Sequence, residues 1–530
     1  MTAPSANNVA DLLTRTAQQY GDRPALVTAE GATTWAQLDT MVSRVAAGLQ
    51  KIGVGDGERV VIVLPTSMEF VTAYLGTLRA GGVAIPLNTG YTAGELARLI
   101  GRTDSGVVIA GDPATTSVRQ AVAGIADALQ DATDEMVGRR VPTLAVTGPA
   151  LPGEVAFADV PAQESELTAH DRGGEDVAVM LFTSGSSADP RAAMLSHRAL
   201  VSNLDQLMEI EPRPVTEEDV LLGILPFFHV YGLNTVLGQA LVAGASVVIE
   251  QRFDPVGTLR SIVDHGVTIV PVAPPMLVAW TEVDDLSASL AGVRYIVSGA
   301  APLSLAVIDD ITGRTGVTVH QGYGLTEAAP VVSTTFASPD PKPGSVGRPL
   351  PGTQVMLVDD DGEPVDEGDP GEVVVRGPNL FSGYWPGDVE GPDPDGWWRT
   401  GDVAYADQDG DLHLVDRIKD LVIVNGFNVY PREVEEVLLG HPDIAQAAVV
   451  SVPDRRTGEA VKAVVVPEEG SALTVEDVEA FCAQRLARFK RPAVVEVMTE
   501  LPRTATGKIA KGRLRDASAR ESDKRLAGLT

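Results

Sequence analysis

The sequence of 530 residues contains one cysteine, no long apolar run and comparatively few basic residues. The single cysteine, Cys482, excludes an intrachain disulfide, and its place in the helical pattern VEDVEAFCAQRLA favours a packing role over a nucleophilic one. No apolar stretch reaches the roughly 20 residues that a transmembrane helix needs. The first residues lack the charged and apolar segments of a secretory signal. A soluble protein of the reducing cytoplasm is therefore expected.

Basic residues are outnumbered, because 41 Lys and Arg face 72 Asp and Glu, which gives a formal net charge of −31. Such a charge argues against wrapping nucleic acid and against lying on an anionic membrane, since both partners are negatively charged. An anionic substrate would need local positive sites against this overall field. Acidity of this kind mainly favours solubility.

Apolar residues, glycine and proline are abundant, in a chain longer than one ordinary domain. In the first half, short apolar runs alternate with helical patterns, which predicts a parallel sheet covered by helices. Strands are expected at residues 59–65, 82–86, 105–110 and 246–250. Helices are expected at residues 67–80, 92–100 (with Thr92 as N-cap), 118–132 and 233–243.

The composition changes after Gly352, where Gly, Pro and Asp are frequent. The runs QVMLVD, GEVVVRG and DLHLVDR in this part are typical of antiparallel strands. A compact αβ unit is expected after Arg417. Its strands are expected at residues 447–453, 460–466 and 493–498, and its helix at residues 474–486. These patterns place a domain boundary near residues 416–420.

Four stretches carry residues suited to phosphate chemistry. The first, MLFTSGSSADPRAAMLSH (180–197), runs from an apolar strand into a loop of hydroxyls and glycine. These loop residues are Thr183, Ser184, Gly185, Ser186 and Ser187. Small residues let backbone N–H groups approach a phosphate, and Arg191 adds positive charge. Taken alone, an ordinary serine-rich loop is equally compatible, and the G-x-x-x-x-G-K-[ST] pattern is absent.

The other three stretches offer partners for a nucleotide. VHQGYGLTEAAP (319–330) contains Tyr323, which could stack on a purine, and Thr326 and Glu327, which could meet phosphate and Mg²⁺. Between residues 397 and 435, Asp402 and Arg417 could hydrogen-bond ribose hydroxyls. In LPRTATGKIAKGRLR (501–515), Lys508 follows a glycine. Taken singly, such residues are more often a buried tyrosine, surface ion pairs and a solvated lysine.

In their joint order, the motifs TSGSS, PFFHVYGLN, VSGAAPL, GYGLTE, RTGD, DRIKD and PRTATGK resemble the adenylate-forming superfamily of acyl- and aryl-CoA synthetases, luciferases and peptide-synthetase adenylation domains. The resemblance covers nearly the whole chain. It implies an α/β fold with a large N-terminal domain of parallel βα-layered sheets plus a β-barrel-like part, and a small mobile C-terminal α+β domain. The implied limits are 1–416 for the large domain, 417–420 for a hinge and 421–530 for the lid.

The resemblance also implies ATP, Mg²⁺ and coenzyme A as cofactors, and a role for each motif residue. Tyr323 would stack on adenine, Thr326 would contact the α-phosphate, Glu327 would hold Mg²⁺, and Lys508 would reach the α-phosphate and the carboxylate. Nucleotide-binding residues are implied to be Thr183 to Ser187, Arg191, Gly299, Ala300, Ala301, Tyr323, Gly324, Asp402 and Arg417. The acyl and thiol tunnel is implied to include His229, Tyr231, Ser298, Gly322 and Gly426, with Lys419 at the hinge.

The implied chemistry is physically consistent with these residue types. A carboxylate that attacks an α-phosphate brings two anions together, and the barrier falls when a metal ion and a lysine neutralise charge in the transition state. A small domain on a hinge could deliver Lys508 for this step and the thiol tunnel for the next one.

The chain departs from the family's usual phosphate loop, T-S-G-[ST]-T-G-x-P-K-G, at Ala188, Arg191 and Ala192. Alanine in a left-handed backbone would cost about 1–2 kcal/mol. Arg191 keeps the positive charge of the usual lysine, but its guanidinium is planar with several donors, whereas a lysine ammonium is a compact point charge. A working loop of different shape is expected, because the other motif residues remain. A nucleotide-binding pseudo-enzyme is the alternative.

Amino-acid-activating members of the superfamily carry an aspartate near the position of PFFHVYG to meet the α-amine, and this segment has none. The resemblance therefore disfavours an amino-acid substrate and implies a fatty or aryl acid in an apolar pocket. Coenzyme A is the expected acceptor, with a carrier protein as the alternative. Arg488, Lys490 and Arg491 could meet the phosphates of coenzyme A or could form a solvated helix end. A luciferase-like oxygenase is a further alternative, and assembly as a homodimer is compatible with the sequence.

Overall fold

The computed structural model describes residues 8–130, 140–163, 167–168, 170, 172–183, 191–359, 361–386, 390–417, 420–424, 427–454, 458–503 and 508–515. The chain forms two units, residues 1–354 with 375–398 and residues 355–374 with 399–530. The second unit therefore includes residues 355–374, which belong to the stretch after Gly352 that is rich in Gly, Pro and Asp. The domain limits expected at residues 416 and 420 stay a prediction.

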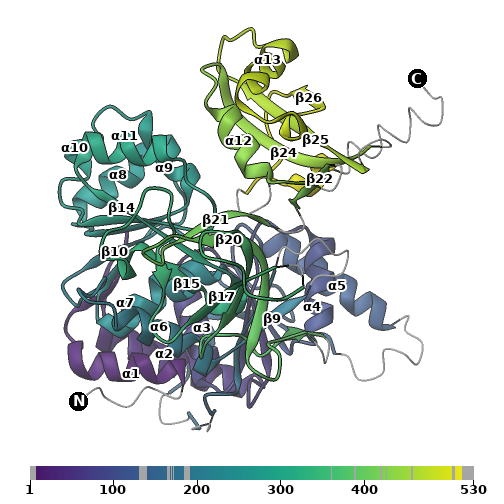
Figure 1. Cartoon of the computed structure of the whole chain (residues 1–530). Helices are drawn as coiled ribbons and strands as arrows, with labels where there is room; N and C mark the ends of the chain where they lie inside the picture. The colour runs from purple at the N-terminus through teal and green to yellow at the C-terminus, as the bar shows by residue number, and fades with distance from the viewer. Residues whose placement is uncertain are drawn as a thin grey trace. The chain divides into compact units, whose positions relative to one another are not determined.

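The first unit contains an eight-stranded sheet in the order β19-β9-β8-β4-β3-β5-β6-β7. Its strands are β3 (Arg59–Val63), β4 (Val83–Pro86), β5 (Val107–Ala110), β6 (Thr143–Val146), β7 (Val155–Ala156), β8 (Val177–Phe182), β9 (Ala192–Ser196) and β19 (Tyr384–Trp385). Strands β3 to β8 pair in parallel, whereas β9 pairs antiparallel with β8 and with β19. The helices in this region are α3 (Met68–Arg79), α4 (Ala93–Thr103) and α5 (Thr115–Gln130) (Figure 1). The pattern expected for residues 59–130 is confirmed.

Short polar side chains begin the helices of this sheet. Ser67 Oγ accepts a hydrogen bond from the Phe70 N–H (3.2 Å) at the start of α3. Thr92 and Glu95 form a reciprocal capping box, in which the Glu95 carboxylate accepts from the Thr92 N–H at 2.8 Å. Such a cap contributes about 1 kcal/mol. Thr92 is therefore the N-cap that the sequence predicted.

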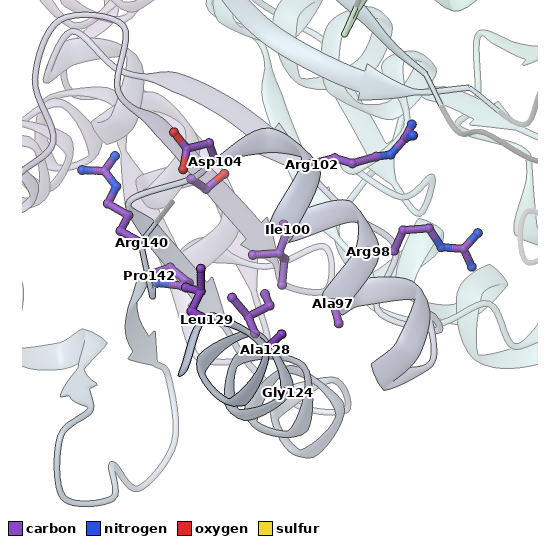
Figure 2. Close-up of a pocket in the computed structure, with 13 residues that line it drawn as sticks. Ala97, Arg98, Ile100, Arg102, Asp104, Gly124, Ala128, Leu129, Arg140 and Pro142 are labelled. Carbon is purple, nitrogen blue, oxygen red and sulfur yellow. The ribbon is translucent and has the colours of Figure 1, made fainter. Parts of the chain in front are cut away.

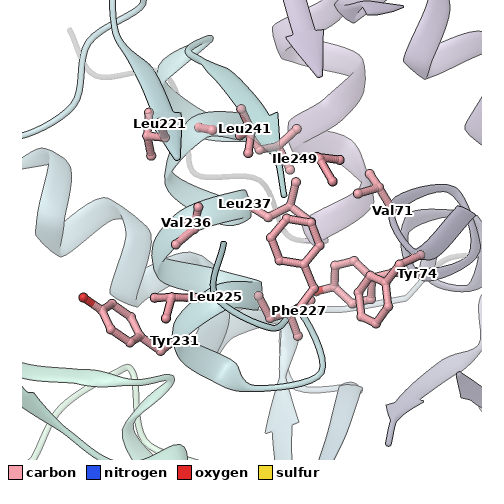
Figure 3. Packing of buried hydrophobic residues seen from close by; sticks show 14 of the residues in the cluster. Val71, Tyr74, Leu221, Leu225, Phe227, Tyr231, Val236, Leu237, Leu241 and Ile249 are labelled. Carbon is pink, nitrogen blue, oxygen red and sulfur yellow. The ribbon is translucent and has the colours of Figure 1, made fainter. Parts of the chain in front are cut away.

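Two hydrophobic layers cover this sheet, because successive side chains of a strand point to opposite faces. In β3, Val60 and Ile62 join the large central core, while Val61 and Val63 join a second cluster with Leu96 of α4. The central core continues to Phe227: the ring of Phe70 lies 5.7 Å from that of Phe227 and 6.4 Å from that of Tyr74. Figure 3 shows Phe227 and Tyr74 in this cluster. The core therefore joins the two sheets of the first unit.

The second sheet of this unit has nine strands in the order β16-β15-β14-β13-β12-β10-β11-β1-β2. They are β1 (Pro24–Thr28), β2 (Gly31–Thr34), β10 (Val220–Gly223), β11 (Ser246–Ile249), β12 (Ile269–Val272), β13 (Tyr295–Ser298), β14 (Thr318–Gly324), β15 (Val331–Thr334) and β16 (Arg348–Pro349). The inner strands are parallel, and β2, β15 and β16 are antiparallel to their neighbours. Helices α1 (Val9–Tyr20), α2 (Trp35–Lys51) and α6 (His197–Met208) pack on the central core, and α8 (Pro255–Asp264), α9 (Pro274–Thr281), α10 (Leu286–Ser289) and α11 (Leu305–Thr315) follow along the chain (Figure 1).

The helix expected at residues 233–243 differs from a regular α-helix. Residues Tyr231–Gly238 form a π-helical segment, and only α7 (Gln239–Ala243) is α-helical. Gly232 allows the chain to pass close to Pro226, because a Cβ at Gly232 would lie 2.4 Å from the Pro226 carbonyl oxygen. π-Helical turns are frequent at functional sites.

The second unit contains a four-stranded sheet, β17-β18-β20-β21, and a smaller αβ part. The sheet strands are β17 (Gln354–Val358), β18 (Gly371–Arg376), β20 (Trp397–Ala406) and β21 (Leu412–Arg417). The αβ part contains β22 (Val422–Val424), β23 (Phe427–Val429), α12 (Pro431–Leu439), β24 (Ile444–Asp454), β25 (Gly458–Pro467), α13 (Val475–Arg485) and β26 (Val494–Val497), which confirms the elements expected there. Cys482 of α13 is fully buried in its core, and burial raises the pKa of the thiol, so it packs as expected.

No helix within the described ranges is long and apolar enough to span a bilayer.

Candidate active site

The carboxyl ends of β13 and β14 bring two predicted motifs together. The strands are parallel, and Ser298 pairs with Gln321, so the residues after Ser298 follow beside the segment 322–324. In open α/β sheets, ligands bind at the carboxyl ends of parallel strands. The predicted site residues at this edge are Ser298, Gly299, Ala300, Ala301, Gly322, Tyr323, Gly324, Thr326 and Glu327.

The end of β13 is closely packed under Tyr231. A Cβ at Gly299 would lie 3.0 Å from the Tyr231 ring, and the Tyr231 hydroxyl donates to the Val297 carbonyl oxygen at 3.1 Å. Ser298 is buried, and its hydroxyl has no hydrogen-bond partner among the described residues. Ala300 has a left-handed backbone (φ 69°), which costs about 1–2 kcal/mol and is typical of strained functional turns.

His229 lies at the start of the π-helical segment, two residues before Tyr231. Its backbone N–H donates to the Pro226 carbonyl oxygen at 3.1 Å, and its ring Nδ1 accepts from the Tyr231 N–H at 3.3 Å. A neutral ring that accepts at Nδ1 carries its proton on Nε2. The structure therefore places His229 and Tyr231 on one turn, and Tyr231 in turn packs on Gly299.

The segment after β14 turns sharply at Glu327. Gly324 is required there, because a Cβ would lie 2.1 Å from the Pro330 carbonyl oxygen. Thr326–Ala328 form a 3₁₀ turn, and Ala329 has a left-handed backbone (φ 62°). Tyr323 is buried, whereas the side chains of Thr326 and Glu327 are half-buried. The turn thus leaves Thr326 and Glu327 partly accessible.

Three buried asparagines hold the backbone directly after Glu327. Asn379 Nδ2 donates to the Ala328 carbonyl oxygen at 2.7 Å, and Asn234 Nδ2 donates to the Ala329 carbonyl oxygen at 2.7 Å. Asn203 donates to the carbonyl oxygen of Val331 (2.9 Å) and accepts from its N–H (3.2 Å). Asn203 belongs to α6, Asn234 to the π-helical segment, and Asn379 to the loop before β19. Three separate segments therefore hydrogen-bond to the backbone of this turn.

The Glu327 carboxylate itself is met by Tyr384 of β19. The Tyr384 hydroxyl donates to Glu327 Oε1, and the Phe381 N–H donates to the Glu327 carbonyl oxygen at 2.8 Å. Burial, together with the Glu327 carboxylate, raises the pKa of Tyr384, which keeps the hydroxyl a donor. Among the described residues, no lysine, arginine or histidine is paired with Glu327.

This environment fits Mg²⁺. The ion prefers one or two carboxylates together with phosphate oxygens and water. Glu327 offers a partly accessible carboxylate whose described partner is a neutral hydroxyl, and not a competing cation. No group of three or more His, Cys, Asp or Glu side chains with metal-ligand geometry occurs in the described residues, so most ligands of an ion here would be phosphate and water.

The β8–β9 hairpin presents the ends of the predicted phosphate loop. The Thr183 N–H donates to the Arg191 carbonyl oxygen at 3.2 Å, so the two residues face each other at its mouth. Ser184, Gly185, Ser186, Ser187 and Ala188 lie outside the described residues. The Arg191 guanidinium forms an ion pair with Glu390, and both side chains are exposed. Arg191 is therefore engaged by a carboxylate that a triphosphate would have to displace.

The second unit contains the remaining predicted residues. Asp402 is buried at 6% exposure, and its position pairs with that of Arg417 across the antiparallel strands β20 and β21. Lys508 is exposed and directly precedes Ile509, which forms a bridge with Arg503. Lys419 and Gly426 lie outside the described residues. The structure thus brings the two expected ribose-binding positions opposite each other.

Two of the three cations expected to meet coenzyme A have internal partners. Lys490 Nζ donates to both carboxylate oxygens of Glu433 at 2.7 Å, and Arg491 Nε donates to the Leu486 carbonyl oxygen at 3.0 Å. These contacts hold the chain after α13 against α12. They favour the structural alternative for Lys490 and Arg491.

A cavity of about 400 Å³ lies between α4 and α5 (Figure 2). Its lining combines apolar side chains such as Ile100 and Leu129 with Arg98, Arg102 and Arg140. The cavity lies beside the residues that precede β5 and β6. It is therefore at the amino-terminal edge of these parallel strands, opposite their carboxyl ends. None of the predicted site residues is among its described lining, so the cavity is separate from the candidate active site.

Two family models match the chain: AMP-binding enzyme over residues 13–385, and AMP-binding enzyme C-terminal domain over residues 433–508. This chain belongs to the AMP-binding enzyme family. The first match covers every predicted site residue of the first unit, and the second ends at Lys508. The family and the α/β fold class expected from the motifs are therefore confirmed.

Named relatives cover almost the full chain. A 4-coumarate–CoA ligase 5 of Oryza sativa subsp. japonica is 35% identical over 93% of this chain and 91% of its own length. A long-chain-fatty-acid–CoA ligase of Bacillus subtilis is 33% identical over 95% and 93%. The crystal structure of ATP-bound MatB from Rhodopseudomonas palustris superposes with a TM-score of 0.87 at 33% identity, covering 96% of this chain and 99% of MatB. These likenesses agree with the expected acid–thiol ligase activity.

Sequence reasoning missed the residues that hold the Glu327 turn. Three of them lie outside the motif segments that were chosen for chemistry: Asn203, Asn379 and Tyr384. The fourth, Asn234, is the last residue of the motif PFFHVYGLN, but no role was assigned to it. Tyr384 lies in the aromatic run FSGYW, within a stretch that is otherwise rich in glycine, proline and aspartate. This aromatic run is the sequence feature that could have drawn attention to it.

Proposed function

We infer that this member of the AMP-binding enzyme family is an ATP-dependent acid–CoA ligase. It activates a carboxylic acid as acyl-AMP and then passes the acyl group to the thiol of coenzyme A. The observation that carries this conclusion is the family match over both units, together with a half-buried carboxylate at Glu327, which among the described residues has a tyrosine hydroxyl as its side-chain partner, after a strand of a parallel sheet. The names of the relatives supply the class of acceptor.

The first half-reaction is adenylation. An oxygen of the substrate carboxylate attacks the α-phosphorus of ATP, and the bond to the pyrophosphate leaving group breaks. Mg²⁺ bound at Glu327 would supply charge neutralisation on the phosphates. Thr326 would bind the α-phosphate, Thr183 and Arg191 would hold the β- and γ-phosphates, and Lys508 would neutralise charge between the two anions. Tyr323 and the segment Gly299–Ala301 would hold the adenine.

The second half-reaction is thioester formation. The thiol of coenzyme A loses its proton, its sulfur attacks the acyl carbonyl carbon, and AMP leaves with the bond electrons. Tyr231 packs on Gly299 at the end of β13, and His229 is hydrogen-bonded to the Tyr231 N–H, so we propose that the acyl carbonyl binds near this turn. We propose coenzyme A, and not a carrier protein, as the acceptor, because the named relatives are CoA ligases.

The acid is proposed to be apolar, either aryl or fatty. The segment before the π-helix carries no carboxylate that could bind an α-amine, and Tyr231 offers an aromatic wall beside Gly299. Relatives named for 4-coumarate and for long-chain fatty acids represent the two chemical classes. The hydroxyl of Ser298, buried and without a described partner, lies at the same strand end.

Purified chain with ATP, Mg²⁺ and coenzyme A tests this function against aryl acids and fatty acids of graded length. We expect AMP release and a thioester of the corresponding mass for one of the two classes, and no product with amino acids. Pyrophosphate exchange into ATP reports adenylation separately from thioester formation. Absence of acid-dependent exchange across the whole panel would contradict the proposal, and exchange without thioester would favour a carrier protein as acceptor.

Three further expectations belong to this proposal. The limits 1–416, 417–420 and 421–530, with Lys419 at the hinge, predict that limited proteolysis cuts near residue 420. Gly426 is proposed to line the thiol tunnel. A cytoplasmic location and a homodimer remain proposals, and light scattering of the purified chain measures the oligomeric state directly.

A further inference from the structure

Tyr384 is the side chain that touches the Glu327 carboxylate in the described chain. Its hydroxyl donates to Glu327 Oε1 across 57 residues of sequence. The backbone of Glu327 is tied to the same region, because the Phe381 N–H donates to its carbonyl oxygen at 2.8 Å. The 381–384 segment thus contacts both ends of Glu327.

The ring of Tyr384 is itself fixed. It lies edge-on to Phe381, with ring centroids 5.0 Å apart, and 6.1 Å from the ring of Trp398. Its backbone pairs with Ala193 of β9, just after the phosphate loop, and its N–H donates to the Glu390 carbonyl oxygen at 3.0 Å. The hydroxyl therefore has little freedom to leave Glu327, and it sits on the strand that neighbours the loop.

We propose that Tyr384 is a positioning residue for metal binding: its hydroxyl orients the Glu327 carboxylate so that the opposite oxygen faces the metal ion bound with ATP. This inference rests on the proposed role of Glu327. A carboxylate with one oxygen held by a fixed donor keeps one rotamer and directs its other oxygen at the ion. Hydrogen-bonded partners of metal ligands typically change metal affinity or activity about 10- to 100-fold when removed.

The purely structural alternative is that Tyr384 only fills the space between Phe381 and Trp398. Tyr384→Phe separates the two roles, because it keeps the ring in the aromatic cluster and removes only the hydroxyl. A packing role predicts a change in thermal stability at most. The positioning role predicts weaker metal binding in a protein of nearly unchanged fold.

The experiment measures Mn²⁺ binding by electron paramagnetic resonance in the presence of α,β-methylene ATP, whose α–β linkage is not cleaved. We expect Tyr384→Phe to weaken Mn²⁺ binding about 10-fold, while the affinity for the analogue without metal stays within twofold. A matched control is Tyr295→Phe, which likewise removes a tyrosine hydroxyl that donates a hydrogen bond, in this case to the Pro214 carbonyl oxygen and away from Glu327. It should leave Mn²⁺ binding unchanged.

Glu327→Gln completes a double-mutant cycle. It should weaken Mn²⁺ binding strongly, and Tyr384→Phe should then add less than a twofold further loss. If Glu327→Gln has no effect, the proposed role of Glu327 is wrong. If it has an effect but Tyr384→Phe alone does not, the inference about Tyr384 is wrong and the proposed function stands. An equal Tyr384→Phe effect in both backgrounds also overturns the inference, because the hydroxyl would then act elsewhere.

A second variant guards against a folding defect in Tyr384→Phe. Glu327→Asp keeps the charge but withdraws the carboxylate by one methylene from the Tyr384 hydroxyl. We expect it to reproduce the loss of Mn²⁺ affinity at an unchanged unfolding temperature. Wild-type Mn²⁺ affinity in Glu327→Asp would contradict the need for this contact.

Discussion

The turn at Glu327 and the segment at Lys508 are both expected to act on the same triphosphate, yet they are built in opposite ways. Glu327 belongs to the first unit, and its turn receives hydrogen bonds from Asn203, Asn234 and Asn379. Lys508 belongs to the second unit, is exposed, and directly precedes Ile509, which forms a bridge with Arg503.

The difference shows two ways of supplying charge to a reaction. A group that is fixed before the substrate arrives needs no reorganisation during the chemical step, which is how preorganised sites stabilise a transition state. A group on a separate unit can be present for one step and absent from the next. In the proposed mechanism, adenylation takes place at the α-phosphorus and thioester formation at the neighbouring acyl carbon, so we expect a fixed group and a group that can leave to serve the two steps.

Replacing Lys508 should give the largest effect of the comparison. We expect Lys508→Ala to lower the adenylation rate about 10²- to 10³-fold, because one charge-stabilising group is lost from the transition state. Thioester formation from added acyl-AMP should change far less. Rapid-quench measurement of the two half-reactions checks this.

Lys342→Ala is the matched control for the charge change, because Lys342 is a partly exposed lysine that forms an ion pair with Asp340 at 3.0 Å and lies outside the predicted site. Both variants should unfold at the wild-type temperature. Equal losses in the two half-reactions of Lys508→Ala would show that this lysine does not serve one step alone.

Removing an asparagine that holds the turn at Glu327 should lower the free energy of unfolding as well as the reaction rate. Asn379 is fully buried and donates to the carbonyl oxygens of Ala328 and Val331. Asn379→Ala removes the side-chain donor of the Ala328 carbonyl oxygen, whereas Val331 keeps the hydrogen bond from Asn203, so we expect the free energy of unfolding of the first unit to fall by about 1–3 kcal/mol. Urea denaturation measures this change.

Asn88→Ala is the control for Asn379→Ala, because Asn88 makes a local contact to the Gly90 N–H at 2.8 Å and no contact to the turn. It should cost less than about 1 kcal/mol. An unchanged stability of Asn379→Ala would mean that the turn keeps its shape without this asparagine.

The smallest effect is expected at the mouth of the phosphate loop. Arg191 and Glu390 form an exposed ion pair, and such pairs contribute about 0–1 kcal/mol. Arg191→Lys and Glu390→Gln should therefore each change the KM for ATP by no more than about threefold, with Glu390→Gln lowering it. Initial rates over a range of ATP concentrations decide this. A tenfold change in either variant would show that the pair controls access of the triphosphate.

Local patterns were sufficient to predict the framework that carries the site. The alternation from β3 through α4 to β5, the capping box of Thr92 and Glu95, and the packing of Cys482 all depend on residues within a few positions of one another. The same holds for the glycines of the GYG segment, where Gly324 passes close to Pro330. The motif order then identified the family, which the two family models confirm.

Contacts between distant segments could not be read from those patterns. The hydrogen bonds to the Glu327 turn span 128 residues from Asn203, 95 from Asn234, 51 from Asn379 and 57 from Tyr384. Nothing in the local sequence of an asparagine says which backbone carbonyl it will meet. The helix expected at residues 233–243 is present, but the sequence pattern did not predict the π-helical form of Tyr231–Gly238, where Gly232 passes close to Pro226.

The residue types suited to adenylate chemistry and the starts of many strands and helices follow from the amino-acid sequence, because side-chain periodicity and helix caps are local. How the Glu327 turn is held follows from the packing of distant segments, since Tyr384 of β19 meets its carboxylate and asparagines of α6 and the π-helical segment meet its backbone. The physical reason is that burial of an asparagine or a tyrosine hydroxyl requires a partner, and that partner exists only after distant strands have packed.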